Sequence, residues 1–262
     1  MRRERAPIWI AILAAIGAAF FVVPLIGLVV KTPWGDALQS LTSTDTMEAL
    51  KLSLIASLSA TAVSLVLGVP LAWIYARIDF PGRTVLRALT TLPMVLPPVV
   101  GGIALFLAFG RRGLVGSLLD TTFGITLPFT TAGVVFAETF VAMPFLVLTV
   151  EAGLRSMDRR YEAAARTLGA RRWTVFTRVT LPLIAPSLLA GAVLCWARAL
   201  GEFGATITFA GNFPGVTQTM PLAVYLLLES NHPEGSFILS LLLLLVSLAV
   251  LVGLRHRWLG SA

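Results

Sequence analysis

The chain has 262 residues, of which 57% are hydrophobic and only 13% are charged, whereas about a quarter of the residues in an ordinary soluble domain are charged. With a mean hydropathy of +0.88, the surplus apolar surface has no suitable solvent except lipid, which argues against a water-soluble fold. The net charge of +7 could indicate nucleic-acid binding, but the arginines lie between apolar runs, where they orient helices in a bilayer. Membrane lipid, and no nucleic acid, is therefore the expected partner. The single cysteine, Cys195, excludes an internal disulfide.

Six long apolar segments are expected to cross the membrane as helices, because a spanning helix needs about 20 residues and satisfies its backbone groups internally. In chain order they are Pro7–Val30, Leu50–Tyr75, Val85–Phe109, Ala132–Leu154, Pro182–Ala210 and Phe237–Leu254. A shorter apolar segment, Pro221–Leu228, reaches only about 12 Å as a helix, which is less than half the hydrocarbon thickness. We predict that this segment is a re-entrant or interfacial helix.

The arginines define the expected orientation in the membrane. With six spans and the N-terminus inside, 15 of the 20 basic residues lie on the cytoplasmic side, in agreement with the positive-inside rule. Arg111 and Arg112 fall on the outer side, against the rule. The sequence therefore predicts an all-α membrane protein with six transmembrane helices and both termini in the cytoplasm.

Prolines interrupt most of the predicted spans, and the run from Pro93 to Gly102 is the densest interruption. Each proline removes a helix hydrogen bond, which neighbouring groups or water must replace within the membrane. The run therefore indicates either a hinge or cavity-lining kink, or the ordinary tolerance of proline in buried spans. The sequence leaves both interpretations open.

The largest polar segment is the predicted inner loop 155–181, which contains seven arginines. Gly169 follows a helix-forming stretch and suits a helix C-terminus, because glycine adopts a left-handed backbone at little cost. Two short helices joined at this glycine would form a rigid projection. Such a projection fits either a membrane-surface amphipathic helix or a docking element for a cytoplasmic partner.

This loop resembles the EAA loop of ABC-importer permeases, in which Glu-Ala-Ala is followed by three residues, Gly, nine residues, Ile, one residue and Leu-Pro. The residues that match the spacing are Gly169, Val179, Leu181 and Pro182, with Val in place of Ile. Counting back from Gly169, the Glu-Ala-Ala positions are Ala163, Ala164 and Ala165, so Glu162 lies one residue early. The resemblance implies that an ATPase subunit docks on Glu162, Ala163, Ala164, Ala165, Gly169, Ala170, Arg171 and Arg172.

The resemblance extends over about residues 48–255, and Ala197–Tyr225 is similar to the corresponding stretch of molybdate-importer permeases, whose outline sulfate permeases share. It implies a type I ABC-importer permease fold and a permease subunit that translocates molybdate, or alternatively sulfate or tungstate, across the cytoplasmic membrane. The implied organisation is a tail, first span and outer loop over 1–47, a permease domain over 48–255 and a cytoplasmic tail over 256–262. The implied partners are a second permease subunit, which is expected to be a copy of this chain with a different permease as the alternative, a cytoplasmic ATPase dimer and an extracytoplasmic binding protein.

The sequence contains no phosphate-binding loop, which indicates that any ATP hydrolysis takes place on another chain. Neither Lys31 nor Lys51 lies in a Gly-x4-Gly-Lys-Ser/Thr phosphate-binding loop. We therefore expect that the chain is not an enzyme, binds no cofactor itself and depends on ATP used by a partner subunit. An ion-gradient-driven secondary transporter and a membrane scaffold protein are the alternatives from other classes.

Three charged residues, Glu138, Arg198 and Glu202, fall inside predicted spans, where charge is costly unless it is paired or faces water. Arg198 and Glu202 are four residues apart and share one helix face. Arg198 could contact a tetrahedral oxyanion in the translocation path, or the two could neutralise each other, with Glu138 joining them. The second interpretation is preferred because an importer that held its anion tightly would release it slowly. In a secondary transporter the three residues would form a relay.

The outer loop 211–219 precedes the short apolar helix. We expect it to form an outer gate and a docking surface for the binding protein, with the alternative that it is a plain connection. The residues assigned to this role are Asn212, Pro214, Gly215 and Thr219. No catalytic residue is expected, and no metal site, because His232 and His256 fall on opposite sides of the membrane and no His/Cys cluster exists.

Overall fold

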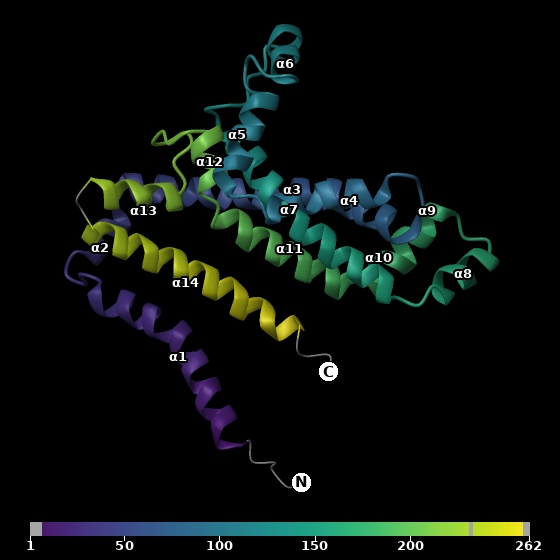
Figure 1. Ribbon diagram of the computed structural model, residues 1–262, viewed down its shortest axis with the longest axis horizontal. Coiled ribbons are helices and arrows are strands. Elements are labelled where there is room, and N and C mark those ends of the chain that lie inside the picture. Colours follow the sequence, from purple (N-terminus) through teal and green to yellow (C-terminus); the bar gives the residue numbers. More distant parts are fainter. Residues whose placement is uncertain (1–6, 231–232, 259–262) are drawn as a thin grey trace.

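The computed structural model describes residues 7–230 and 233–258 of the chain (Figure 1). All regular secondary structure within these ranges is helical, which confirms the predicted fold class. The helices are α1 (Ile8–Lys31), α2 (Ala37–Thr42), α3 (Thr44–Arg77), α4 (Arg83–Thr91), α5 (Pro98–Phe109), α6 (Gly116–Phe123), α7 (Thr131–Ser156), α8 (Arg160–Thr167), α9 (Arg172–Val175), α10 (Leu181–Leu183), α11 (Ala185–Leu200), α12 (Gly204–Phe209), α13 (Met220–Glu229) and α14 (Pro233–Trp258), with a 3-10 turn η1 (Leu92–Met94) and a π-helical turn η2 (Phe176–Thr180). Parts of the two predicted tails lie outside the described residues, namely positions 1–6 and 259–262. Of the two histidines, His232 lies outside them as well, and the side chain of His256 is not described.

Helices α3, α7 and α11 form the centre of the molecule and run along its long axis (Figure 1). Small residues allow their backbones to approach closely, as is usual in membrane bundles. Ala60, Ala72 and Ala142 are completely buried between them. A Cβ added at Gly68 of α3 would lie 2.9 Å from Leu146 of α7. Close contact between helix backbones at small residues therefore contributes to the packing of the bundle, in addition to its larger apolar side chains.

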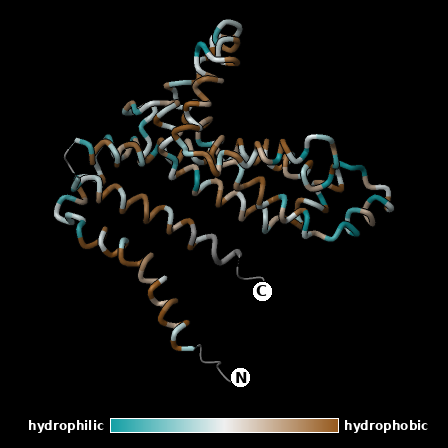
Figure 2. Tube along the Cα trace, in the orientation of Figure 1, coloured by the Kyte–Doolittle hydropathy of each residue, from teal (hydrophilic) through white to brown (hydrophobic). Residues whose placement is uncertain are grey.

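Helix α1 diverges from this bundle toward its N-terminal end (Figure 1). None of its 24 residues is buried, although its composition is strongly apolar. Figure 2 shows hydrophobic residues along α1 and α14, and hydrophilic residues gathered around α8 and α9. The exposed apolar surface of α1 is suited to lipid or to another membrane helix.

Four helices, α1, α3, α7 and the described part of α14, are long and apolar enough to cross a membrane. Two further spans were predicted as single helices, and the structure shows that both are broken. In the first, α4 with η1 and α5 meet at 119°. At the start of the second, the segment Arg172–Leu183, most of which was expected in the inner loop, meets α11 at 73°. The prediction of six spans therefore holds only if each bent pair counts as one crossing.

Local sequence explains both breaks. Pro97 and Pro98 cannot donate backbone hydrogen bonds, and proline disfavours helical geometry in the residue before it, so α5 starts afresh at Pro98 after the turn η1. In the second pair, η2 widens the helix and Pro186 follows the break at Ile184. By contrast, Pro24, Pro70 and Pro144 lie within the continuous helices α1, α3 and α7. The break at α4–α5 thus contains two adjacent prolines, whereas each of these continuous helices contains only one.

The predicted fifth span also ends earlier than expected. Helix α11 stops at Leu200, and α12 starts at Gly204 after a short connection. α12 packs on α5, and both depart from the direction of the central helices (Figure 1). The predicted short apolar segment is a separate helix, α13, which lies with α2 at the end of the molecule opposite α8 and α9.

Candidate functional site

The segment from α8 to α9, here called the coupling element (residues 160–175), has the predicted form of two helices joined at a glycine. α8 ends at Thr167, and Gly169 adopts a φ of +85°. The Ala170 N–H donates to the Ala165 carbonyl, and the Gly169 N–H donates to the Arg166 carbonyl, each at 3.0 Å. This pair of bonds is the Schellman arrangement, which satisfies carbonyls at the end of a helix and requires a left-handed residue. The glycine therefore gives the element a defined shape.

The side chain of Glu162 points from the coupling element toward the rest of the molecule and is buried rather than exposed at the surface. Its side chain is 8% exposed, and its Oε1 accepts hydrogen bonds from Arg77 Nη2 at 3.3 Å and from the Thr180 hydroxyl at 2.9 Å. Arg77 ends α3, and Thr180 ends η2. This carboxylate therefore fastens α8 to two other elements, while the expected part of residue 162 in ATPase docking stays a prediction.

The other predicted docking residues lie at the surface or close to it. Ala163, Ala164, Gly169, Arg171 and Arg172 are exposed, while Ala165 and Ala170 are half-buried. Large apolar side chains are exposed beside them, namely Tyr161, Leu168 and Trp173. Exposed apolar side chains among charged ones are characteristic of a protein interaction surface. The surface suits a partner that covers the small alanines closely.

The structure brings together the three predicted intramembrane charges. Arg198 Nη2 lies 2.5 Å from Glu202 Oε2, so the predicted pair forms, although Glu202 follows the end of α11 and does not share a helix face with Arg198. The other oxygen of Glu202 accepts the Ala205 N–H at 2.8 Å and thereby ties this carboxylate to α12. Glu138 on α7 is 1% exposed, and α7 packs against α12, to which Glu202 is tied. The geometry matches mutual neutralisation of Arg198 and Glu202, whereas Glu138 has no ion-pair partner among the described residues.

The predicted outer loop is partly exposed and partly fixed. Pro214 and Gly215 are exposed, Asn212 is half-buried, and Thr219 is 1% exposed. Thr219 is thus the buried end of the loop, and the gating and docking roles expected of these residues stay predictions. The Thr131 hydroxyl donates to the Val216 carbonyl at 2.9 Å, which ties the loop to the start of α7.

Residues 64–259 match the family described as "Binding-protein-dependent transport system inner membrane component". The chain belongs to this family. Among its relatives, the molybdenum transport system permease protein ModB of Mycobacterium tuberculosis is 46% identical over 96% of this chain and 94% of its own length. ModB of Escherichia coli is 44% identical over 81% of this chain and 93% of its own length. The sulfate transport system permease protein CysT of Escherichia coli is 38% identical over 85% of this chain and 81% of its own length.

Solved structures show the same fold for the permease. A chain of a bacterial ABC transporter involved in the import of the acidic polysaccharide alginate superimposes with a TM-score of 0.74, covering 97% of the permease and 96% of that chain, at 20% identity. A chain of the MetNI methionine ABC transporter, in inward-facing conformations, gives a TM-score of 0.61 at 17% identity and covers 84% of the permease and all of that chain. At these identities the likeness concerns the fold alone.

One charge cluster of the permease was missed by sequence reasoning. Glu151 of α7 is 1% exposed, and its two oxygens lie 3.1 Å from Arg87 Nε and 2.7 Å from Arg155 Nη2. The contact with Arg87 fastens the amphipathic helix α4 to α7. The spacing of Glu151 and Arg155, four residues apart on one helix, was the available signal, whereas the contact with α4 is tertiary.

The permease also has an unexpected ion pair at the turn between α5 and α6. Arg111 Nε lies 3.0 Å from Asp120 Oδ2. The hydrogen bond from Arg111 lowers the pKa of the Asp120 carboxyl below its usual value. Arg111, which the positive-inside rule placed on the wrong side, is therefore compensated locally by an acidic neighbour.

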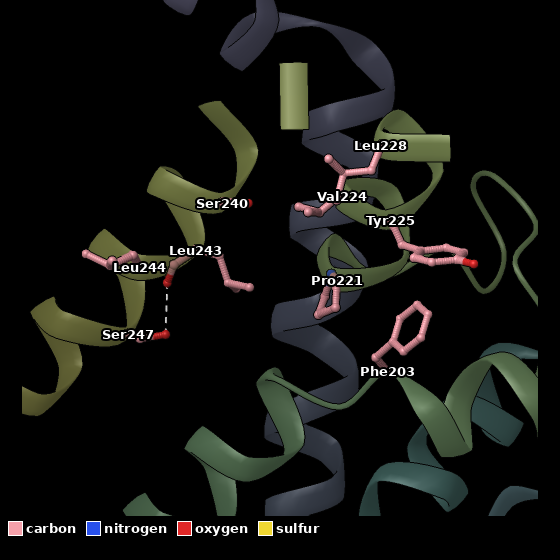
Figure 3. Close-up of a pocket in the computed structure, with 9 residues that line it drawn as sticks. All are labelled: Phe203, Pro221, Val224, Tyr225, Leu228, Ser240, Leu243, Leu244 and Ser247. Carbon is pink, nitrogen blue, oxygen red and sulfur yellow. Dashed lines mark hydrogen bonds between the residues drawn. The ribbon is translucent and has the colours of Figure 1, made fainter. Parts of the chain in front are cut away.

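An apolar groove of the permease lies between α13 and α14 (Figure 3). In Figure 3, Val224 of α13 and Leu243 of α14 flank the groove, and Phe203 and Tyr225 lie beside each other at one side. Its volume is about 510 Å³, and its lining is almost entirely apolar. Such a lining suits lipid chains or another helix rather than an anion.

Proposed function

We propose that this permease is the membrane-spanning subunit of an ATP-binding-cassette importer that translocates molybdate across the cytoplasmic membrane. The observation that carries the proposal is similarity along almost the whole chain to a molybdenum transport system permease, at 46% identity over 96% of the chain. The matched 96% of the chain is long enough to include both the coupling element and the intramembrane charges.

The proposed complex contains two copies of this chain, a cytoplasmic ATPase dimer and an extracytoplasmic binding protein. The coupling element would receive the ATPase, since it combines a rigid shape with exposed alanines, arginines and the side chains of Tyr161 and Trp173. The exposed part of the outer loop, around Pro214 and Gly215, would meet the binding protein. ATP is used by the ATPase chain, and this chain binds no cofactor of its own.

The coupling element can transmit movement because it is fixed to the bundle at defined points. The Glu162 carboxylate connects α8 to α3 and to η2, and Glu151 connects α4 to α7. When the ATPase subunits close, displacement of α8 would move the ends of α3 and η2 together. The breaks at α4–α5 and at α10–α11 allow helix segments to change angle, so that the path opens to each side in turn.

Reconstitution in proteoliposomes tests this proposal. The permease is combined with its ATPase and molybdate-binding protein, and uptake of molybdate is measured with ATP, with a non-hydrolysable analogue and with an imposed ion gradient. We expect uptake only with ATP and binding protein. Gradient-driven uptake without ATP would instead identify a secondary transporter, and absence of transport under every condition would identify a scaffold protein.

Sulfate is the second candidate substrate, because a sulfate transport permease is 38% identical over 85% of the chain. Both anions are tetrahedral and doubly charged, so the same path can carry either. Competition distinguishes them: excess sulfate should leave ATP-driven molybdate uptake unchanged when the molybdate-binding protein is used. Sulfate uptake that is faster than molybdate uptake, with each cognate binding protein present, would contradict the assignment to molybdate.

A further inference from the structure

A cavity of about 280 Å³ lies between the coupling element and the end of α3, and its lining includes four arginines beside apolar side chains. The four guanidinium groups that border it belong to Arg77, Arg159, Arg166 and Arg172, and Glu162 is the one acidic residue in the lining. This leaves an excess of three positive charges around a small space. Mutual repulsion of these groups favours the presence of a counter-charge.

Arg77 is the most deeply placed of the four arginines. Its side chain is 7% exposed, and its Nη2 donates to Glu162. Its Nε and Nη1 have no hydrogen-bond partner within the described chain. A buried donor without an acceptor is costly, and more so when the group is charged. The Glu162 oxygen that Arg77 contacts is already shared with Thr180, so an additional acceptor is needed.

The three outer arginines are exposed at the rim of the cavity, and two of them are hydrogen-bonded to backbone carbonyls. Arg159 Nη2 donates to the Ala76 carbonyl at 3.1 Å, and Arg166 Nε donates to the Glu162 carbonyl at 3.1 Å. Arg172 makes no ion pair within residues 7–230 and 233–258. Guanidinium groups offer planar pairs of donors that match the oxygens of phosphate-like anions. The remaining donors of these side chains are therefore available to one small anion.

We propose that this cavity is a binding site for a tetrahedral oxyanion group, which is either a free inorganic anion or the phosphate of an anionic lipid headgroup. The bound group supplies acceptors to the arginines of α3, α8 and α9 at once. It thereby fastens the coupling element to α3 in addition to the Arg77–Glu162 contact. The site lies at the coupling element and is independent of which anion the permease transports.

Anion-dependent thermal unfolding tests the site in the full-length permease, purified in a neutral detergent. Sulfate is titrated against chloride at constant ionic strength, and the unfolding midpoint is followed by tryptophan fluorescence. We expect saturable stabilisation by sulfate, with an apparent affinity about tenfold weaker in Arg172→Gln and in Arg166→Gln. Both variants leave the Arg77–Glu162 contact intact. Arg171→Gln is the matched control, because Arg171 is exposed and adjacent but does not line the cavity.

A second arm distinguishes the source of the anion. The same four proteins are placed in nanodiscs of phosphatidylcholine alone or with phosphatidylglycerol. Stabilisation by sulfate that is weakened only in the two cavity variants supports a free oxyanion. Stabilisation by phosphatidylglycerol alone, with the same dependence on the variants, supports a lipid phosphate. No stabilisation by either, or an equal loss in Arg171→Gln, overturns the proposal.

Discussion

The Glu162 carboxylate of α8 lies 3.3 Å from the Arg77 guanidinium at the end of α3, and both side chains are more than nine-tenths buried. Glu162 belongs to the short helix that is expected to meet the ATPase, and Arg77 belongs to the longest helix of the central bundle. Because buried charges are costly unless they stay together, displacement of α8 and of the end of α3 is coupled. The contact thus links the proposed docking surface to the membrane core.

Replacement of Glu162 with Ala should uncouple and destabilise this region. The Arg77 guanidinium would stay buried without its carboxylate, and such a loss typically costs about 3–5 kcal/mol. The expected result is a lower unfolding midpoint, together with ATP hydrolysis that proceeds without matching molybdate uptake. Glu234→Ala, at an exposed position at the start of α14, is the control. The double variant Arg77→Gln/Glu162→Gln should recover part of the stability, and an unchanged midpoint in Glu162→Ala would refute the structural role.

Replacement of Arg198 with Ala should disrupt assembly more than substrate choice. Glu202, whose side chain is 1% exposed, would lose its ion-pair partner within a predicted span, where an unpaired charge is costly. We expect a destabilisation of about 3–5 kcal/mol, seen as a reduced yield of assembled complex in size-exclusion chromatography. In the complex that does assemble, the preference for molybdate over sulfate should be unchanged. Normal assembly with loss of anion-stimulated transport would instead make Arg198 a contact of the substrate.

The continuous spans could be predicted from the sequence because hydropathy alone determines where a helix can cross a bilayer. The predicted bounds of α1 and α7 differ from the observed ones by only one or two residues, whereas α3 begins six residues before its predicted start and α14 begins four residues before its own. The breaks at α4–α5 and α10–α11 were less predictable. Proline marks where a helix is weakened, but the angle that results depends on what the two halves pack against.

The candidate site was predictable in outline and not in its contacts. The spacing around Gly169 correctly indicated a helix end, since the backbone requirement there is local. The direction of the Glu162 side chain was not predictable, because it depends on Arg77, which is 85 residues away in the chain. The same holds for Glu151, whose contact with Arg87 of α4 depends on how the broken span folds back.

A methyl group at Gly102 should weaken the packing of α5 on α12. A Cβ at this position would lie 1.7 Å from Thr208 Oγ1 and 2.8 Å from the Ala205 carbonyl oxygen. The threonine side chain can rotate, but the backbone oxygen cannot move without shifting α12. Gly102→Ala should therefore lower stability by about 1–3 kcal/mol, measured as the unfolding midpoint in detergent. Gly17→Ala is the matched control, because a Cβ there meets nothing within 4 Å in the middle of α1. Equal midpoints for the two variants would contradict the close packing of α5 and α12.

Accessibility of single cysteines tests the orientation of the chain, which rests on the distribution of arginines. The native Cys195 is completely buried and is first replaced by Ala. In this background, Pro214→Cys in the exposed outer loop should react with a membrane-impermeant maleimide added to intact cells. Ala164→Cys, exposed on α8, should react only after the membrane is permeabilised. Thr219→Cys should react slowly from either side, because the residue is 1% exposed.

The opposite labelling pattern would contradict this orientation. Labelling of position 164 in intact cells, with protection of position 214, would invert the topology and move the proposed ATPase surface to the outside, where no ATP is available to drive import.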